Sequence, residues 1–168
     1  MKIQTCHIRL LVLLCFSLLN LCSYAQPTDD NPGDPAFRIS VSQHMNFGAF
    51  TVGAGGGSVI MSNSGTRTAN GNVILLTGGT TSLQAIFELE LPTGTIVTVV
   101  NGPDATLTGN NGGSMSLQLG NASPASPFAT TAVPPARTQV KVGGTLSVGN
   151  ATIPGTYRGQ FVVSFHYQ

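Results

Sequence analysis

From residue 37 onward, hydrophobic and polar side chains alternate over short segments of the chain. Residues 156–167 are the clearest case, because one side of this segment in extended form carries Tyr157, Gly159, Phe161, Val163, Phe165 and Tyr167. Successive side chains of a strand point to opposite faces, so this period of two residues predicts a half-buried strand. Residues 83–91 alternate in the same way, with Ile86 as the exception.

Similar segments recur between positions rich in Gly, Asn, Ser and Pro, and no helical period is seen beyond the N-terminal segment. We expect strands at residues 37–42, 46–52, 58–62, 71–77, 83–91, 95–100, 105–108, 114–119, 138–142, 144–148 and 156–167. Glycines supply the positive φ angles of tight hairpins, so turns are expected at 53–57, 70–71 and 143–144. The pattern predicts an all-β, antiparallel β-sandwich.

The N-terminus has a different pattern. Lys2 and Arg9 occur without any acid, an apolar run covers 10–22, and small residues follow at 23–25. This arrangement predicts a secretory signal peptide over residues 1–25. The apolar run is shorter than the roughly 20 residues of a transmembrane helix, so we expect cleavage after residue 25 and no stable membrane insertion afterwards. Lipidation at Cys22 is the alternative, although a small residue normally precedes such a cysteine.

A cleaved signal peptide would leave residues 26–168 as the exported chain. We expect transport through the inner membrane to the periplasm, the cell surface or the medium. Residues 26–35 hold three prolines, a glycine and three acids without an apolar side chain, which predicts a flexible leader. Residues 36–168 are long enough for a single sandwich domain. All three cysteines fall within 1–25, so this domain has neither a disulfide nor a thiol nucleophile.

Charge is sparse and balanced, with seven basic and six acidic residues in the whole chain. Lys2 and Arg9 belong to the predicted signal, and the other basic residues do not cluster. Binding to nucleic acid requires several cations on one surface, and binding to a membrane surface requires a basic amphipathic segment. We therefore expect neither partner.

The sequence contains several residues that are familiar from catalytic and metal sites. The glycines at 53–57 lack the lysine and the following helix of a phosphate-binding loop. Glu88 and Glu90 share a strand face, but it is the polar one, and we expect both to be solvated. His44 and His166 have no accompanying ligands at metal-site spacing. We thus expect no catalytic residues, no cofactor and no metal ion, and hence a protein that is not an enzyme.

Several segments together resemble a bacterial exported family, the domain of unknown function 4402. They are residues 45–48, 57–60 with 64–67, 142–148 and 154–159, and the resemblance spans residues 37–167. This family resembles chaperone-usher pilins, which implies an immunoglobulin-like, pilin-like sandwich. The final strand of pilins has an aromatic residue just before the C-terminus, as Tyr167 does here.

The resemblance also implies a function. Pilins lack one strand of their sandwich and complete it with the N-terminal extension of the next subunit, by β-strand addition. Residues 37–41 alternate as a donor strand would, but we favour the interpretation that they form the first strand of their own domain. The candidate partner-strand contacts are Phe37, Ile39, Val41, Phe161, Val163, Phe165 and Tyr167.

The leading hypothesis is an exported structural or surface protein, either a fimbrial subunit or an accessory to one. Its expected partners are like subunits, or a periplasmic chaperone and an outer-membrane usher. The alternative is an extracellular binding module such as a carbohydrate-binding β-sandwich. That alternative usually requires exposed aromatic side chains, and this chain has no tryptophan and places most Phe and Tyr on predicted buried faces.

Overall fold

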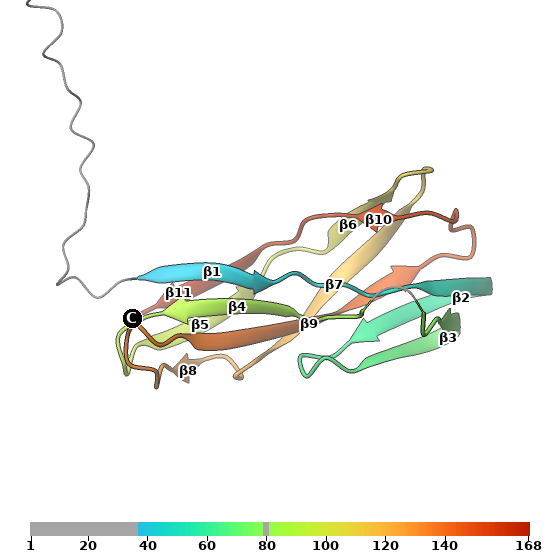
Figure 1. Cartoon of the computed structure of the whole chain (residues 1–168). Helices are drawn as coiled ribbons and strands as arrows, with labels where there is room; N and C mark the ends of the chain where they lie inside the picture. Colours follow the sequence, from blue (N-terminus) through green and yellow to red (C-terminus); the bar gives the residue numbers. More distant parts are fainter. Residues whose placement is uncertain (1–36, 79–80) are drawn as a thin grey trace, which may run out of the picture. The chain divides into compact units, whose positions relative to one another are not determined.

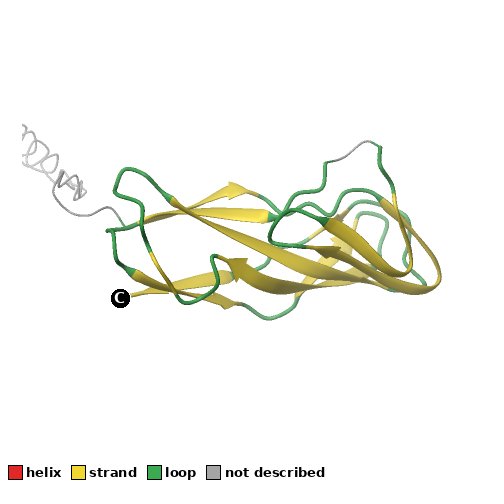
Figure 2. Ribbon diagram, turned by 90° about the horizontal axis from the view of Figure 1, so that it is seen from below, coloured by secondary structure: helices red, strands yellow, loops and turns green. Residues whose placement is uncertain are grey.

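The computed structural model describes residues 37–78 and 81–168, and all the regular structure there is β-strand (Figures 1 and 2). The strands are β1 (Arg38–Gln43), β2 (Phe50–Met61), β3 (Arg67–Leu75), β4 (Ala85–Glu90), β5 (Ile96–Asn101), β6 (Ala105–Gly109), β7 (Ser114–Ser123), β8 (Phe128–Ala129), β9 (Thr138–Val148), β10 (Tyr157–Arg158) and β11 (Val163–Tyr167). The predicted signal peptide and leader lie outside the described residues. No helix of the described residues is long and apolar enough to cross a membrane.

Two antiparallel sheets contain these strands. The larger sheet has the order β1-β4-β9-β7-β6-β10, and β2 pairs with both β3 and β9. The smaller sheet has the order β11-β5-β8. The first half of β9 pairs with β4 and the second half pairs with β2, while β7 lies along its other edge. Strand β9 therefore joins the two halves of the larger sheet.

The core has two connected parts. One contains side chains of β4, β5 and β9, among them Leu89, Val97 and Val140, and Val163 and Phe165 of β11 pack against it. Because these strands come from both sheets, the smaller sheet covers this half of the larger one. The second part lies within the larger sheet, between β2, β7 and β9. Phe161 packs against both parts. The all-β antiparallel sandwich expected from the sequence is confirmed.

The strand order follows that of immunoglobulin domains. Their seven strands A to G form one sheet with the order A-B-E-D and a second with C-F-G. Strands β1, β4, β9 and β7 reproduce the first order, and β5 next to β11 reproduces C next to F. Strands β2, β3, β6, β8 and β10 are additions to this frame. No strand of the described residues occupies the position of G, which is the free edge of β11.

Three predicted hairpin turns are wrong. Residues 53–57 form a bulge within β2, where the pairing with β3 shifts register, and Gly55 and Gly56 have positive φ. Residues 70–71 lie inside β3, which begins at Arg67. Residues 143–144 lie inside β9, so the two strands expected there are one.

Close packing explains the two glycines of β9. A Cβ on Gly143 would overlap the carbonyl oxygen of Met61, and a Cβ on Gly144 would lie 2.9 Å from Leu117 Cδ1. These glycines let neighbouring strands approach closely, and a sequence pattern alone does not separate this role from that of a turn.

The predicted single strand over 156–167 is also divided. Its first part is β10, which pairs with β6 in the larger sheet, and its second part is β11, which pairs with β5 in the smaller one. Between them the chain crosses from one sheet to the other. The alternating pattern continues through the crossing because Tyr157 and Phe161 both pack against the core.

Candidate partner-strand site

The first and the last strands of the described chain meet at one open edge of the sandwich (Figure 1). The ring of Phe37, next to β1, stacks on the ring of Tyr167 in β11, with centroids 5.0 Å apart and planes 21° from parallel. Strand β1 is one outer strand of the larger sheet and β11 is one outer strand of the smaller sheet. We call these two strands, with Phe37, the β1–β11 edge.

The interior of the sandwich is open to solvent along β1. Residues directly opposite each other in a sheet share a face, and Ile39 pairs with Leu89 while Val41 pairs with Phe87. Leu89 and Phe87 are 0% and 8% exposed, whereas Ile39 and Val41 are 44% and 52% exposed. The inward face of β1 is therefore apolar but uncovered.

Strand β11 has an unpaired backbone along the same edge. Gln168 and Ile96 exchange two backbone hydrogen bonds of 3.0 and 3.1 Å, and the Val162 carbonyl accepts one from Gly102. Such pairs recur at every second residue of an antiparallel ladder, so Ser164 and His166 also direct their backbone groups toward β5. The N–H and C=O groups of the residues between them must point to the open side.

Those residues are Val163, Phe165 and Tyr167. Among the described residues, β11 has no strand partner other than β5. Their side chains meanwhile face inward: Val163 and Phe165 pack against the core, and the Phe165 ring meets that of Phe87 edge-on at 5.3 Å. An apolar inner wall thus lies beside a row of free hydrogen-bonding groups, which is the arrangement that an added strand requires.

Six of the seven candidate contact residues lie at this edge. Phe161 does not, because it precedes β11 and packs between the two parts of the core. Of the two interpretations of residues 37–41, the first strand of the same domain describes the structure, since β1 pairs with β4 from Arg38 to Gln43. These residues form one side of the β1–β11 edge.

The acidic pair on β4 has a different environment from the one expected. Glu90 is buried at 8% exposure, so a solvated position is wrong for this residue. Arg137 donates from Nε to Glu90 Oε2 at 3.2 Å and from Nη1 to Glu88 Oε2 at 3.3 Å. The hydrogen bond from Arg137 lowers the pKa of Glu88. A general acid needs a raised pKa, so the shift of Glu88 is in the opposite direction.

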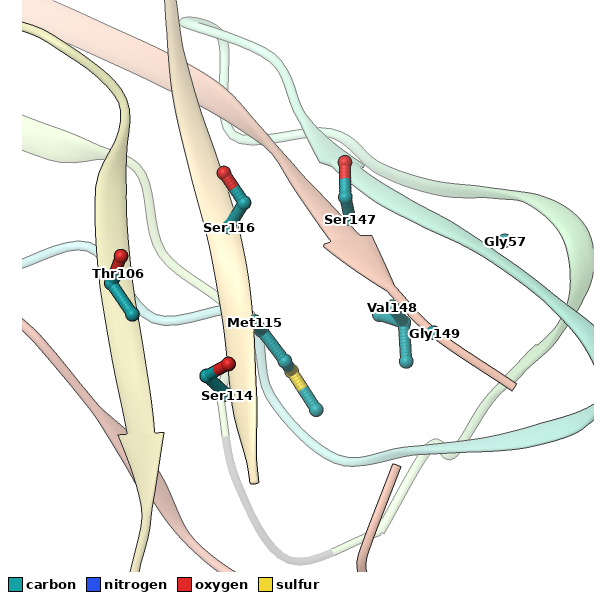
Figure 3. A pocket seen from close by; sticks show the side chains of 8 residues that line it. All are labelled: Gly57, Thr106, Ser114, Met115, Ser116, Ser147, Val148 and Gly149. Carbon is teal, nitrogen blue, oxygen red and sulfur yellow. The ribbon is translucent and has the colours of Figure 1, made fainter. Parts of the chain in front are cut away.

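A shallow polar hollow of about 400 Å³ lies on strands β2, β6, β7 and β9. Figure 3 shows the side chains of Thr106, Ser116 and Ser147 on three adjacent strands, and cross-strand pairing places these three residues in one row. The other lining residues are Gly57, Ser114, Met115, Val148 and Gly149. None of the lining residues carries an ionisable side chain, so the hollow offers hydroxyl groups without a general acid or base.

Within residues 37–78 and 81–168, no group of three His, Cys, Asp or Glu side chains lies close enough together to hold a metal ion. His44 is exposed in the loop that follows β1, and His166 is exposed on β11. The β1–β11 edge is therefore the most distinctive surface of the described chain.

The fold and this edge define a class of all-β sandwich domains in which the last described strand pairs along one edge and is free along the other. Within that class the sequence can be assigned: a family model described as "Domain of unknown function (DUF4402)" matches residues 37–167, and the chain belongs to this family. No curated protein and no solved structure matches the chain.

Proposed function

We propose that this chain is a non-enzymatic, exported structural protein of the cell surface that assembles with a partner by β-strand addition. The observation that carries the proposal is the contrast across β1 and β4. Inward-facing Ile39 and Val41 are about half exposed, while their partners on β4 are buried. A strand placed at the free edge of β11 would cover this face and occupy the position of immunoglobulin strand G.

The chemistry of the edge suits a strand better than a small ligand. The free N–H and C=O groups of three alternate residues match the spacing of another extended backbone. The uncovered side chains are apolar, and covering them releases about 25 cal/mol for each Å² removed from water. A fimbrial subunit or an accessory to one fits both features, since such proteins are held together by added strands.

The test uses cells that express the full chain beside the other proteins of its host. Strand-linked assemblies resist dodecyl sulfate without heating and fall apart on boiling, so a ladder should appear on unheated gels alone. Val41→Lys places a charge on the inward face of β1 and should abolish the ladder. Ser40→Lys, one residue away on the outward face, is the matched control and should keep it. A wild-type protein that runs as a monomer without heating would contradict the proposal.

A further inference from the structure

We infer that the strand received at the β1–β11 edge comes from a different protein, so that this chain accepts a strand and does not donate one to a second copy of itself. This inference rests on the proposed function. It follows from three properties of the molecule: the hydrogen-bonding groups that β11 presents, the shape of the edge, and the composition of the residues that precede β1.

The edge specifies a donor with a particular pattern. A donor residue opposite Val163 or Phe165 would point into the sandwich, toward the uncovered face of Ile39 and Val41. Large apolar side chains fit these two positions. The third inward position lies opposite Tyr167, whose ring is already stacked on that of Phe37 and leaves room for a small side chain. A donor in the position of immunoglobulin strand G would run antiparallel to β11 and would meet Tyr167 first. The matching donor is thus an uncharged strand with a small residue followed, at alternate positions, by two apolar residues.

Residues 26–36 do not fit that pattern. Their sequence is Gln-Pro-Thr-Asp-Asp-Asn-Pro-Gly-Asp-Pro-Ala. Pro27, Pro32 and Pro35 have no backbone N–H to donate to a ladder. Because successive side chains of a strand alternate, an added strand that spans Asp29 and Asp30 would turn one of them toward the apolar wall, and burying an unpaired carboxylate is costly. Ala36 is the only apolar side chain apart from proline, so this segment of a second copy cannot cover Ile39 and Val41.

Residues 37–41 have the right alternation but are already engaged. Strand β1 pairs with β4 over Arg38–Gln43, and Phe37 is held on Tyr167. If β1 left to complete a second copy, it would expose Leu89 and Phe87 and remove one wall of its own acceptor edge. In a polymer of this chain alone, each copy would therefore open its own β1–β11 edge when its β1 closed the edge of the next copy. A separate donor protein closes the edge without that exchange, which places this chain at the end of an assembly.

Amide hydrogen exchange of the exported protein, purified from cells that express the full chain, tests the inference with three synthetic peptides. The first has the sequence Thr-Gly-Thr-Val-Thr-Val-Thr, the second is residues 26–36, and the third is residues 37–43. The first should slow exchange at the amides of Val163, Phe165 and Tyr167 by at least about tenfold at saturation. The second should leave these amides unchanged. The third has the required apolar alternation, but it carries the charged Arg38 and has the bulky Phe37 where the first peptide has glycine, and it should protect more weakly than the first.

The purified protein alone should remain monomeric at high concentration and should keep these three amides in fast exchange. Self-assembly into heat-labile oligomers, or protection by the peptide of residues 26–36, would overturn the inference while leaving strand addition intact. If the three amides stay in fast exchange with every peptide, both the inference and the proposed function fail. Val41→Lys should abolish the protection given by the first peptide, and Ser40→Lys should preserve it.

Discussion

The aromatic ring of Phe37 stacks on that of Tyr167, and this contact joins the outer strands of the two sheets. Residues 130 positions apart in the chain thus meet at one end of the open edge. The added strand that we propose would meet the two stacked rings at this end, so we expect it to carry a small side chain there.

A double-mutant cycle measures this contact. Phe37→Ala and Tyr167→Ala each remove one ring, and stacked aromatic pairs contribute about 0.5–1.5 kcal/mol beyond the area they bury. We expect a coupling energy in that range from urea denaturation of the two single variants and the double variant. Phe37→Ala combined with Ile74→Ala is the control, because Ile74 is exposed in β3 and its effect should be additive. Additivity of the first pair would show that the rings do not interact in solution.

Because the β1–β11 edge is open, alanine substitutions at two facing residues should lower the free energy of unfolding by unequal amounts. Leu89→Ala should destabilise the fold by about 2–5 kcal/mol, because a fully buried side chain is lost from the core. Ile39→Ala, directly opposite in the ladder, should cost less than about 1 kcal/mol, since its side chain is already half in water. Equilibrium denaturation of the two isolated variants measures the loss in free energy of unfolding for each. Equal costs would mean that the inward face of β1 is covered in the free protein.

Amide exchange of the free protein should alternate along β11. Ser164 and His166 direct their N–H groups to β5 and should exchange slowly. Val163, Phe165 and Tyr167 direct theirs to the open side and should exchange faster by at least about tenfold. Because all five residues belong to one strand, local unfolding affects them alike and serves as an internal control. Uniform protection along the strand would show that something already occupies its free edge.

Much of this edge could be predicted from the sequence, and particular residues show where prediction stops. The alternation of Val163, Phe165 and Tyr167 correctly places them on one inward face. The same alternation wrongly extends the strand back to Tyr157. The chain crosses from one sheet to the other between β10 and β11, and alternate side chains face the core on both sides of the crossing. Whether β11 has a neighbour on its second edge depends on strands distant in sequence, and no local pattern contains that information.

The glycines show the same limit of prediction from local sequence. A glycine pair predicts a turn whenever only local conformation is considered, and at residues 143–144 this prediction fails. Gly143→Ala should destabilise the fold by about 2 kcal/mol or more, because the new Cβ has no room beside the Met61 carbonyl. Gly120→Ala in β7 is the matched control, with its nearest atoms at 3.6 Å, and should change stability by less than about 1 kcal/mol. Thermal denaturation of the two variants compares them, and a tolerated Gly143→Ala would contradict the close approach of β2 and β9.

The ion pair of Glu88 predicts a dependence of stability on pH. The hydrogen bond from Arg137 lowers the pKa of Glu88 from its ordinary value of 4.5. A carboxylate with a lowered folded-state pKa stabilises the fold above its unfolded pKa, and loses this contribution as the pH falls through the folded value. Glu88→Gln should therefore lower the melting temperature at pH 7 and have no such effect at pH 2. In an Arg137→Ala background, the effect of Glu88→Gln on the melting temperature at pH 7 should shrink. An effect of Glu88→Gln that grows as the pH falls would contradict an origin in the ion pair.

The length of β9 has a consequence for the order in which the chain acquires structure. Strands β2 and β4 end by residue 90, yet both pair with residues 138–148 of β9. Closing the larger sheet therefore needs pairings between residues about 50 to 90 positions apart, which are entropically expensive to form early. A chain that is synthesised from its N-terminus therefore stays incompletely folded until the residues of β9 have been made. If the chain is exported unfolded, as the proposed function requires, such late closure would keep it competent for transport.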